Sequence, residues 1–355
     1  MFDQRLSLVA DVYQRLTDNM YTAGPSLPKI FGAAAPKGNF ASMRTTGWEL
    51  EITWRDHIEL AGKPFNYSIK GTLADSRSFI TKYNNAEKKL GDYYVGQELG
   101  EIWGYTADGL FRSEEEIATS PSQQLVPAHS NGQNIVGDLK FKDLNNDNVI
   151  SRGNYRVDDS GDLSIIGNRS PRYTYGITLN LDWSNIFLTA FLQGVGKQDW
   201  YPSRESRFWG QYNRPYNDYP RWQQDQQFRP EKQNFDAYLP IISGYTAQGG
   251  RALANPIDRY LQNVAYLRLK TLTVGYKLPE TISSCIGAQG LTCYLSGENL
   301  LAWSPLYRIT RDTDVANIWG GGSQLTGLNS DSRMSNDGYN YPMLRSVTLG
   351  ITLDF

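Results

Sequence analysis

The sequence predicts an all-β protein, an antiparallel segment of a transmembrane β-barrel with about eight strands. Apolar and polar residues alternate along several long segments, and the connections between these segments alternate between short and long. In such a barrel one face of each strand meets lipid and the other meets a polar lumen, while short periplasmic turns alternate with long extracellular loops. No run approaches the roughly 18 apolar residues of a membrane helix. These observations favour a barrel wall over a soluble sandwich, which has no reason to sort its loops by length.

The last segment, 341–355, has the clearest alternation. One face carries Val347, Leu349, Ile351, Leu353 and Phe355, and the polar or small residues between them form the other face. Chain ends in soluble proteins tend to be polar and frayed, so a terminal aromatic residue is unusual there. Phe355 resembles the closing residue that the barrel-assembly machinery of Gram-negative bacteria recognises, and we assign it as a barrel-assembly terminus. An ordinary amphipathic edge strand is the alternative interpretation.

The same alternation predicts seven earlier strands. The strand at 172–183 is the cleanest, because apolar residues occupy every second position from Tyr173 to Trp183. The faces of the last two before the terminal strand are mixed. The predicted ranges are 5–21, 40–55, 64–80, 172–183, 186–195, 264–277 and 291–302.

The connections fall into two classes. The long ones are rich in Gly, Pro, Asn, Asp and aromatic residues. If the C-terminus is periplasmic, every long connection lies outside the cell, so we expect 82–171 and 196–263 to be long extracellular loops at one end of the sheet. The predicted short connections are 56–63, 184–185 and 278–290, and the predicted long ones are 22–39, 82–171, 196–263 and 303–340.

Composition excludes some classes of protein. The formal net charge of −2 gives no polybasic signature for binding nucleic acid. Aromatic residues make up 13% of the chain, which suits interfacial girdles or ligand-stacking loops. Cys285 and Cys293 are the only cysteines, and either a local disulfide or two unbonded thiols fits their spacing.

The N-terminus does not read as a signal peptide. We therefore expect the chain to be the back part of something longer, through truncation, a split gene or a partial gene model.

Five segments together resemble the SusC/RagA family of TonB-dependent outer-membrane importers from Bacteroidota. They occur in the order and at the spacing of that family across nearly the whole chain. The first contains GYTADGLF and ends with Glu-Glu-Ile, and the second is GDLKFKDLNNDNVI. The five segments are 96–117, 137–150, 166–176, 266–279 and 295–303.

The resemblance implies that residues 1–355 are the C-terminal portion of a barrel of roughly 22 strands. Signal, TonB box and plug match nothing in this sequence. The family's partners would be TonB–ExbB–ExbD, reached through the missing N-terminal part, a SusD-like lipoprotein lid, outer-membrane lipid, and an oligosaccharide or peptide substrate. The expected location is the outer membrane. Alone, the segment should form an open, curved sheet with two unpaired edges, and closure into a small eight-stranded barrel is the disfavoured alternative.

The segment beginning at Asp143 has the spacing of a calcium loop. Hard oxygen ligands at alternate positions can wrap around Ca²⁺, but a turn glycine and a bidentate Glu at position twelve are missing. Asp158, Asp159 or Asp162 could supply the missing carboxylate. An Asx-rich turn without metal is the alternative. The candidate ligands for weak, structural Ca²⁺ are Asp143, Asn145, Asp147, the Val149 carbonyl and Asn154.

The connection 196–263 is a candidate substrate-binding loop because it interleaves aromatic residues with arginines. Flat aromatic faces suit sugar rings or peptide side chains, and Arg pairs with carboxylates. Packing of the loop on itself or on a partner subunit explains the same residues and is the favoured alternative. The candidate substrate-binding residues are Trp200, Tyr201, Trp209, Tyr212 and Trp222.

The sequence gives little support for an enzyme. His57 and His129 are far apart, and no nucleophile elbow, phosphate loop or zinc spacing appears. Ser113 and Glu116 read as a capping box that opens a short helix. Two alternatives to an importer component stay open: a soluble extracellular β-rich carbohydrate-binding module, and a non-functional barrel fragment.

Overall fold

The computed structural model describes residues 4–24, 30, 32, 36–129, 131–318 and 343–355. Parts of the predicted connections 22–39 and 303–340, together with Tyr341 and Pro342, lie outside the described residues. Among the described residues, no helix has the length and apolarity to cross a membrane.

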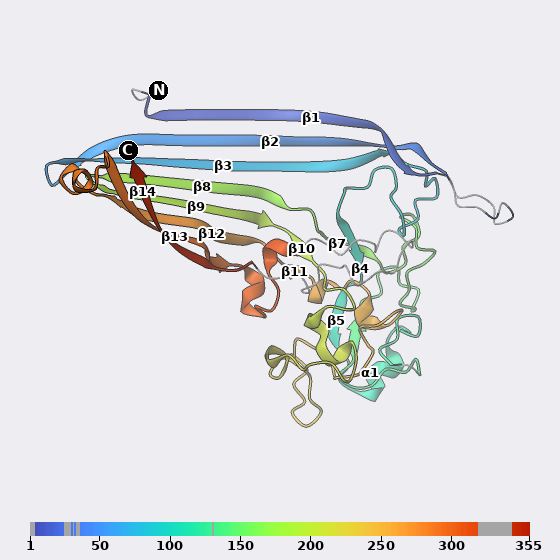
Figure 1. Cartoon of the computed structure of the whole chain (residues 1–355). Helices are drawn as coiled ribbons and strands as arrows, with labels where there is room; N and C mark the ends of the chain where they lie inside the picture. Colours follow the sequence, from blue (N-terminus) through green and yellow to red (C-terminus); the bar gives the residue numbers. More distant parts are fainter. Residues whose placement is uncertain (1–3, 25–29, 31, 33–35, 130, 319–342) are drawn as a thin grey trace.

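One large antiparallel sheet dominates the structure (Figure 1). Each strand pairs with the strand that precedes and follows it in the chain order β1-β2-β3-β8-β9-β12-β13-β14. All eight predicted strands are therefore confirmed. They are β1 (Leu6–Ala23), β2 (Lys37–Leu60), β3 (Lys63–Lys82), β8 (Arg172–Trp183), β9 (Ile186–Lys197), β12 (Tyr266–Lys277), β13 (Gly290–Trp303) and β14 (Ser346–Asp354).

The sheet is open. Its strand order begins at β1 and ends at β14, and within the described part of the chain these two strands do not pair with each other. Figure 1 shows a long, twisted sheet whose strands are progressively rotated from β1 to β14, as the right-handed twist of strands demands. The predicted open sheet with two edges is confirmed, and the small closed barrel is not formed.

The connections are sorted by length between the two ends of the sheet, as predicted (Figure 1). The segment 56–63, predicted as a connection, is mostly strand, because β2 and β3 continue to a two-residue turn at Ala61 and Gly62. Both turn residues have positive φ, 51° and 72°, as a type I′ hairpin turn requires. Ser184-Asn185 makes the predicted tight turn. The connection before β13 contains α2 (Glu280–Ser283) and η6 (Ser284–Ile286).

The long connections 82–171 and 196–263 fold together, with residues 305–318, into one compact unit that we call the loop module (Figure 1). It contains short two-stranded sheets, one short helix and several 3₁₀ turns. The elements are β4 (Glu101–Gly104) with β7 (Ser164–Asn168), β5 (Ala107–Leu110) with β6 (Leu139–Phe141), β10 (Asp199–Trp200) with β11 (Gln262–Asn263), α1 (Glu114–Thr119), η2 (Arg207–Tyr212), η3 (Arg221–Gln223), η4 (Ala252–Ala254), η5 (Asp258–Tyr260), η7 (Pro305–Arg308) and η8 (Val315–Asn317).

Helix α1 begins as its sequence predicts. The Ser113 hydroxyl accepts a hydrogen bond from the Glu116 N–H at 3.1 Å, and the Glu116 carboxylate accepts one from the Arg112 N–H at 2.7 Å. The second bond reaches one residue further back than in a standard capping box. The predicted helix start is confirmed.

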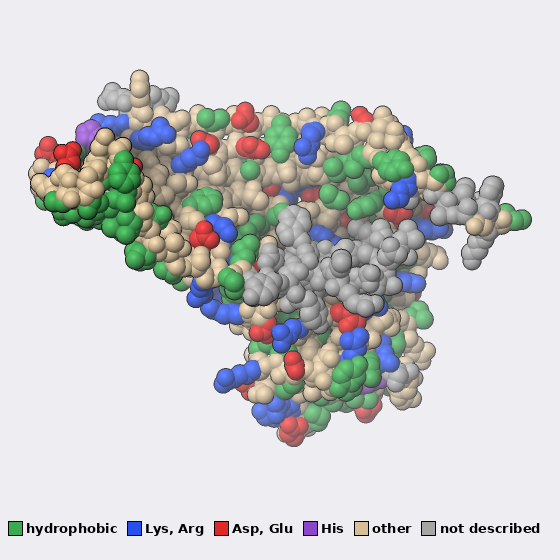
Figure 2. All heavy atoms as spheres, viewed as in Figure 1, with side chains coloured by type: hydrophobic (Ala, Val, Ile, Leu, Met, Phe, Trp, Pro, Cys, Tyr) green, Lys and Arg blue, Asp and Glu red, His purple; other side chains and the backbone are tan. Residues whose placement is uncertain are grey.

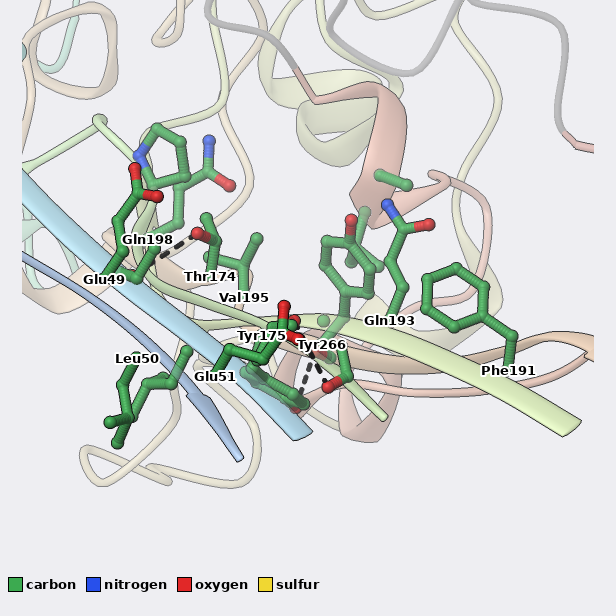
Figure 3. Close-up of a pocket in the computed structure, with 18 of the residues that line it drawn as sticks. Glu49, Leu50, Glu51, Thr174, Tyr175, Phe191, Gln193, Val195, Gln198 and Tyr266 are labelled. Carbon is green, nitrogen blue, oxygen red and sulfur yellow. Dashed lines mark hydrogen bonds between the residues drawn. The ribbon is translucent and has the colours of Figure 1, made fainter. Parts of the chain in front are cut away.

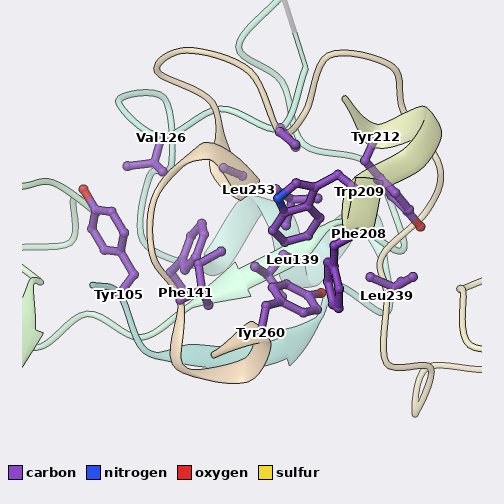
Figure 4. Packing of buried hydrophobic residues seen from close by; sticks show 14 of the residues in the cluster. Tyr105, Val126, Leu139, Phe141, Phe208, Trp209, Tyr212, Leu239, Leu253 and Tyr260 are labelled. Atoms are coloured by element: carbon purple, nitrogen blue, oxygen red, sulfur yellow. The ribbon is translucent and has the colours of Figure 1, made fainter. Parts of the chain in front are cut away.

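The hydrophobic core lies in the loop module rather than on the sheet (Figure 4). Its fully buried members come from both long connections, for example Phe111 and Ile150 from the first and Trp209 and Tyr260 from the second. Leu306 joins them from the third connection. Segments about a hundred residues apart therefore exclude water together, which makes the module a single packing unit.

The loop module is fastened to the sheet by backbone hydrogen bonds. The Ile80 N–H donates to the Gln97 carbonyl at 2.9 Å, and the Leu99 N–H donates to the Ser78 carbonyl at 2.8 Å. Residues 96–99 thus extend the sheet beside the end of β3, beyond the point where β8 stops pairing with it. The two cysteines are unbonded, and the Cys285 thiol donates to the Thr281 carbonyl at 3.1 Å, so the disulfide alternative is not formed.

Candidate functional site

The strand register collects the apolar residues of all eight strands on one side of the sheet, which we call the apolar face. Leu8 lies opposite Ile52, and Leu295 lies opposite both Val274 and Leu349. Many of these side chains are exposed, 75% for Leu349 and 84% for Val12 on the two edge strands. Monomeric soluble proteins rarely expose a contiguous apolar surface of this extent, so such a face marks a contact with lipid or protein.

Hydrophobic side chains are visible along β14 and at the sheet end that carries the turn before β13 (Figure 2). Leu349, Ile351 and Leu353 of β14 are among the exposed apolar residues. Acidic and basic side chains are scattered elsewhere on the sheet in the same view. The two kinds of surface belong to opposite sides of the strands, because successive side chains of a strand alternate in direction.

The other side of the sheet, which we call the polar face, is crosslinked by side chains. The Thr273 and Ser296 hydroxyls lie 2.8 Å apart across β12 and β13. The Asn180 amide donates to the Ser68 hydroxyl at 3.2 Å, and Lys70 pairs with Glu51 at 2.8 Å. These lateral contacts satisfy polar groups that would be costly on a lipid-exposed surface.

A cavity of about 660 Å³ lies against the polar face near the loop module. Glu49 and Glu51 of β2 border it on one side, and Gln193 and Phe191 of β9 border it on the other (Figure 3). Tyr266, at the start of β12, also lines it. The cavity therefore combines carboxylates, an amide and aromatic rings, which is the mixture that holds polar organic molecules in protein pockets.

The carboxylates give the cavity a negative side. Asp11 lies directly opposite Glu49 in the β1–β2 register, an arrangement of like charges that destabilises a strand pair. Glu51 has Lys70 as an ion-pair partner, whereas Asp11 and Glu49 form no ion pair within the described residues. A site that keeps two like charges together at a cost is suited to ligand groups that carry positive charge or donate hydrogen bonds.

Ion pairs hold the sheet and the loop module together next to this cavity. The Arg172 guanidinium binds both carboxylate oxygens of Asp75, and Arg77 binds Glu98. Arg172 also lies 3.9 Å from Glu98. Tyr173, with φ of 54°, interrupts the β8 backbone at this point and lets Arg172 turn toward Asp75. The network links β3 and β8 to the segment that begins the loop module.

The structure places the five predicted substrate-binding residues in or against the core of the loop module. Trp209 and Tyr212 are fully buried (Figure 4). Trp200 is nearly so, and Tyr201 and Trp222 pack against the same cluster. This arrangement favours the packing interpretation. Their contact with substrate stays a prediction.

The polar groups of three of these aromatic residues donate hydrogen bonds to backbone carbonyls within the loop module. The Trp209 indole N–H donates to the Pro202 carbonyl at 3.1 Å, and the Tyr212 hydroxyl donates to the Pro240 carbonyl at 2.7 Å. The Tyr201 hydroxyl donates to the Leu253 carbonyl at 2.9 Å. Burial raises the pKa of the Tyr201 and Tyr212 phenols well above the ordinary value, so both stay neutral donors.

The oxygens of the predicted calcium loop are occupied by local hydrogen bonds. The two Asp143 oxygens accept from the N–H groups of Asn146 and Asn148 at 2.7 and 2.8 Å. Asp147 accepts from the Val149 N–H at 2.8 Å. This is the pattern of an Asx-rich turn. Among the residues that the structure describes, no group of three or more His, Cys, Asp or Glu is placed to hold a metal ion.

The remaining calcium candidates also have other partners. The Asn145 side chain donates to Asp147 at 2.9 Å, and Asn154 donates to Asp159. Asp162, considered as a replacement carboxylate, is fully buried and accepts from the Leu144 and Ser151 N–H groups at 2.7 and 2.8 Å. Asp162 therefore links the two ends of the predicted calcium loop, at Leu144 and Ser151. Calcium binding stays a prediction.

The cavity itself is not predicted from the sequence. Alternation within 40–55 puts Glu49 and Glu51 on one face of a strand, but it does not bring Asp11, Phe191 or Tyr266 to the same place. Strand alternation alone contains part of the signal, since residues of equal parity share a face. The register between strands, which aligns Asp11 with Glu49, was needed for the rest.

Comparison with known proteins gives three relatives by sequence, all from the bacterium Formosa agariphila. The chain is 24% identical over 369 residues to TonB-dependent receptor P26 and 23% identical over 372 residues to TonB-dependent receptor P3. Both alignments cover 100% of this chain and 33% of the relative. TonB-dependent receptor P39 is 27% identical over 220 residues, or 53% of this chain and 20% of the relative. The chain thus spans about a third of the length of the first two curated relatives.

Solved structures agree in fold. The RagAB peptide transporter matches with a TM-score of 0.63 at 17% identity, covering 100% of this chain and 34% of that chain. The RagAB peptide importer in the "open-open" state matches with a TM-score of 0.59 at 17% identity, covering 100% of this chain and 33% of that chain. The chain matches no established family model.

These similarities confirm the resemblance that the five sequence segments indicate. Over its whole length the chain is similar to about a third of TonB-dependent receptors P26 and P3, and its eight-stranded antiparallel sheet has the fold of part of the barrel of the RagAB transporter. The relatives are receptors and transporters by name, which agrees at that level with the expectation that this chain is not an enzyme.

Proposed function

We propose that this chain forms part of the wall and the outward-facing loops of an importer in the outer membrane of a Gram-negative bacterium. The observation that carries this proposal is the division of the sheet into a continuous exposed apolar face and a crosslinked polar face with a cavity. A barrel that conducts a polar solute through lipid needs both faces on the same strands. The apolar face would meet lipid, and the polar face would line the lumen.

The energetics of the apolar face support a membrane location. Each Å² of apolar surface left in water costs about 25 cal/mol relative to burial. Val12, Leu16, Val347 and Leu349 are all more than half exposed, and none is covered by the loop module. Lipid acyl chains would remove this cost without requiring another protein layer.

The relatives support a more specific version of the proposal. Their names refer to TonB dependence and, for RagAB, to peptide transport. We infer that the complete protein is energised by TonB and takes up peptides or glycan fragments with a SusD-like lipoprotein as a lid. The loop module, at the end of the sheet opposite the short turns, is the surface on which such a lid would rest (Figure 1).

Cysteine labelling in outer membranes tests the proposal. In a background where Cys285 and Cys293 are replaced by Ser, Leu349→Cys would place a thiol on the apolar face and Thr348→Cys would place one on the polar face. A lipid-soluble maleimide should label Leu349→Cys, and a membrane-impermeant maleimide, applied after permeabilisation, should label Thr348→Cys. Equal labelling of both positions by the impermeant reagent would contradict a lipid-facing wall.

A further inference from the structure

A groove of about 500 Å³ lies where the loop module meets the ends of β8, β9, β12 and β13. Part of its lining comes from the apolar face, and we call this part the floor. In the register, Tyr175 lies opposite Gly194, Gly194 opposite Leu267, and Leu267 opposite Trp303. Tyr175, Leu267 and Trp303 therefore form one row across four strands, and all three line the groove.

Because Gly194 has no side chain, the Tyr175 ring has room to lie over it in this floor. A Cβ atom built on Gly194 would lie 2.4 Å from the Tyr175 ring, closer than real Cβ contacts come. The Tyr175 ring thus lies flat across β9, and its hydroxyl donates to the Tyr266 carbonyl at 3.1 Å. The floor is apolar and lies on the same side of the strands as the apolar face.

Two arginines complete the groove at its loop side. Arg308, at the end of η7, and Arg311 both line the groove, and both are exposed. The Arg311 guanidinium lies 5.6 Å from the centre of the Tyr307 ring. Neither arginine forms an ion pair with a described residue, whereas nearby Arg268 is buried and paired with Asp314. The groove is therefore lined by two guanidinium groups that no described carboxylate pairs with, together with an apolar floor.

We propose that this groove binds a phosphate-bearing lipid of the outer leaflet. Guanidinium groups bind phosphate through paired, charge-assisted hydrogen bonds. Tyr175, Leu267 and Trp303 would contact the acyl chains below. The inference rests on the proposed function, because a loop end that faces outward puts the arginines at the headgroup level and the aromatic floor at the boundary of the hydrocarbon layer.

The shape of the groove favours a lipid over a free anion. A site for inorganic phosphate would enclose the ion with polar donors on several sides. Here the lining combines the two arginines with the row of Tyr175, Leu267 and Trp303, which belongs to the apolar face. Only a ligand with a charged head and an apolar body satisfies both.

The test uses the complete protein purified from outer membranes in detergent micelles and examined by native mass spectrometry. The probe is dioleoyl phosphatidic acid, compared with dioleoylglycerol and with inorganic phosphate. The Arg308→Gln/Arg311→Gln double variant should weaken retention of phosphatidic acid by at least about tenfold, since it removes two charge-assisted contacts. The matched control is Arg204→Gln/Arg221→Gln, which removes the same charge from exposed loop positions outside the groove and should leave retention unchanged.

Trp303→Ala provides an independent variant, because it removes part of the floor without changing charge. It should weaken retention of phosphatidic acid several-fold. Equal retention by the wild type and both groove variants would overturn the proposal. So would equal retention of dioleoylglycerol, or displacement of the lipid by an equal concentration of inorganic phosphate. If the Leu349→Cys labelling shows lipid contact while these variants bind normally, only the groove is wrong. If Leu349→Cys shows no lipid contact, the proposed function is wrong, and the groove proposal that rests on it is wrong as well.

Discussion

The sheet and the loop module use the same kinds of apolar residue in opposite ways. On the sheet, Leu349 and Val12 expose most of their side-chain surface. In the module, Trp209 and Tyr212 expose none. The module excludes water by packing on itself, as a soluble domain does, whereas the sheet leaves its apolar face for an external apolar medium. One chain thus contains a self-packed module and a sheet with an exposed apolar face, and the boundary between them lies at the ends of the strands.

The largest expected effect is the loss of stability of the loop module when its core is truncated. Trp209→Ala removes a fully buried ring that contacts Phe208 and Tyr260, and large-to-small core changes of this kind cost about 3–5 kcal/mol of unfolding free energy. The module should become sensitive to protease while the sheet stays folded in the membrane. Tyr216→Ala, at an exposed position, is the control and should have little effect. Protease resistance of Trp209→Ala equal to that of the control would show that the module does not depend on this core.

A charge on the apolar face tests the other half of the comparison. Leu349→Arg should cost about 2–4 kcal/mol if the position lies near the middle of the bilayer. Thr348→Arg, on the adjacent polar face, should be tolerated. The fraction of protein inserted in the outer membrane and its melting temperature in detergent measure the difference. Similar behaviour of both variants would place the two faces in the same medium.

A contact inside the module gives a smaller effect. His129 bridges the two long connections, since its Nε2 lies 2.8 Å from Asp138 and its Nδ1 lies 3.1 Å from the Ser243 hydroxyl. Asp138 is buried, and His129→Ala would leave its carboxylate with the Ile135 N–H as its remaining hydrogen-bond donor at 2.8 Å. The loss should be about 1–3 kcal/mol in denaturant unfolding of the module.

His57→Ala is the matched control for that variant. His57 is exposed on the polar face, far from the module in sequence, and its replacement should leave the module's denaturation midpoint unchanged. A midpoint for His129→Ala that coincides with that of His57→Ala would mean that the bridge does not hold the connections together.

The smallest expected effect lies at α1. The Lys140 ammonium and the Arg112 N–H lower the pKa of the Glu116 carboxyl. Because the folded-state pKa is depressed, this stabilisation is present above the unfolded pKa of about 4.3 and is lost as the pH falls through the folded value. Glu116 is partly exposed, so Glu116→Gln should cost less than about 1 kcal/mol at pH 7. The difference between wild type and variant in urea unfolding should shrink below pH 4, and a constant difference would contradict the assignment.

The strands were predictable because their signal is local. A period of two follows from backbone geometry, so the sequence near Tyr173 to Trp183 or Val347 to Leu353 reveals both strand and faces without any knowledge of neighbours. The capping box at Ser113 is equally local. The prediction of a connection over 56–63 is wrong because β2 continues past its clear alternation, and a hairpin turn needs only two residues with positive φ.

The sequence by itself determined the number of strands, the two faces of the sheet, the sorting of connections and the resemblance to a receptor family. Tertiary structure alone decided that Trp209 is buried in the core, that Asp11 lies opposite Glu49, and that Arg308 and Arg311 line one groove with Tyr175 and Trp303. The physical reason is range. Strand faces follow from the alternation of neighbouring residues, whereas burial, registers and grooves arise from contacts between segments far apart in the chain, whose partners no local pattern identifies.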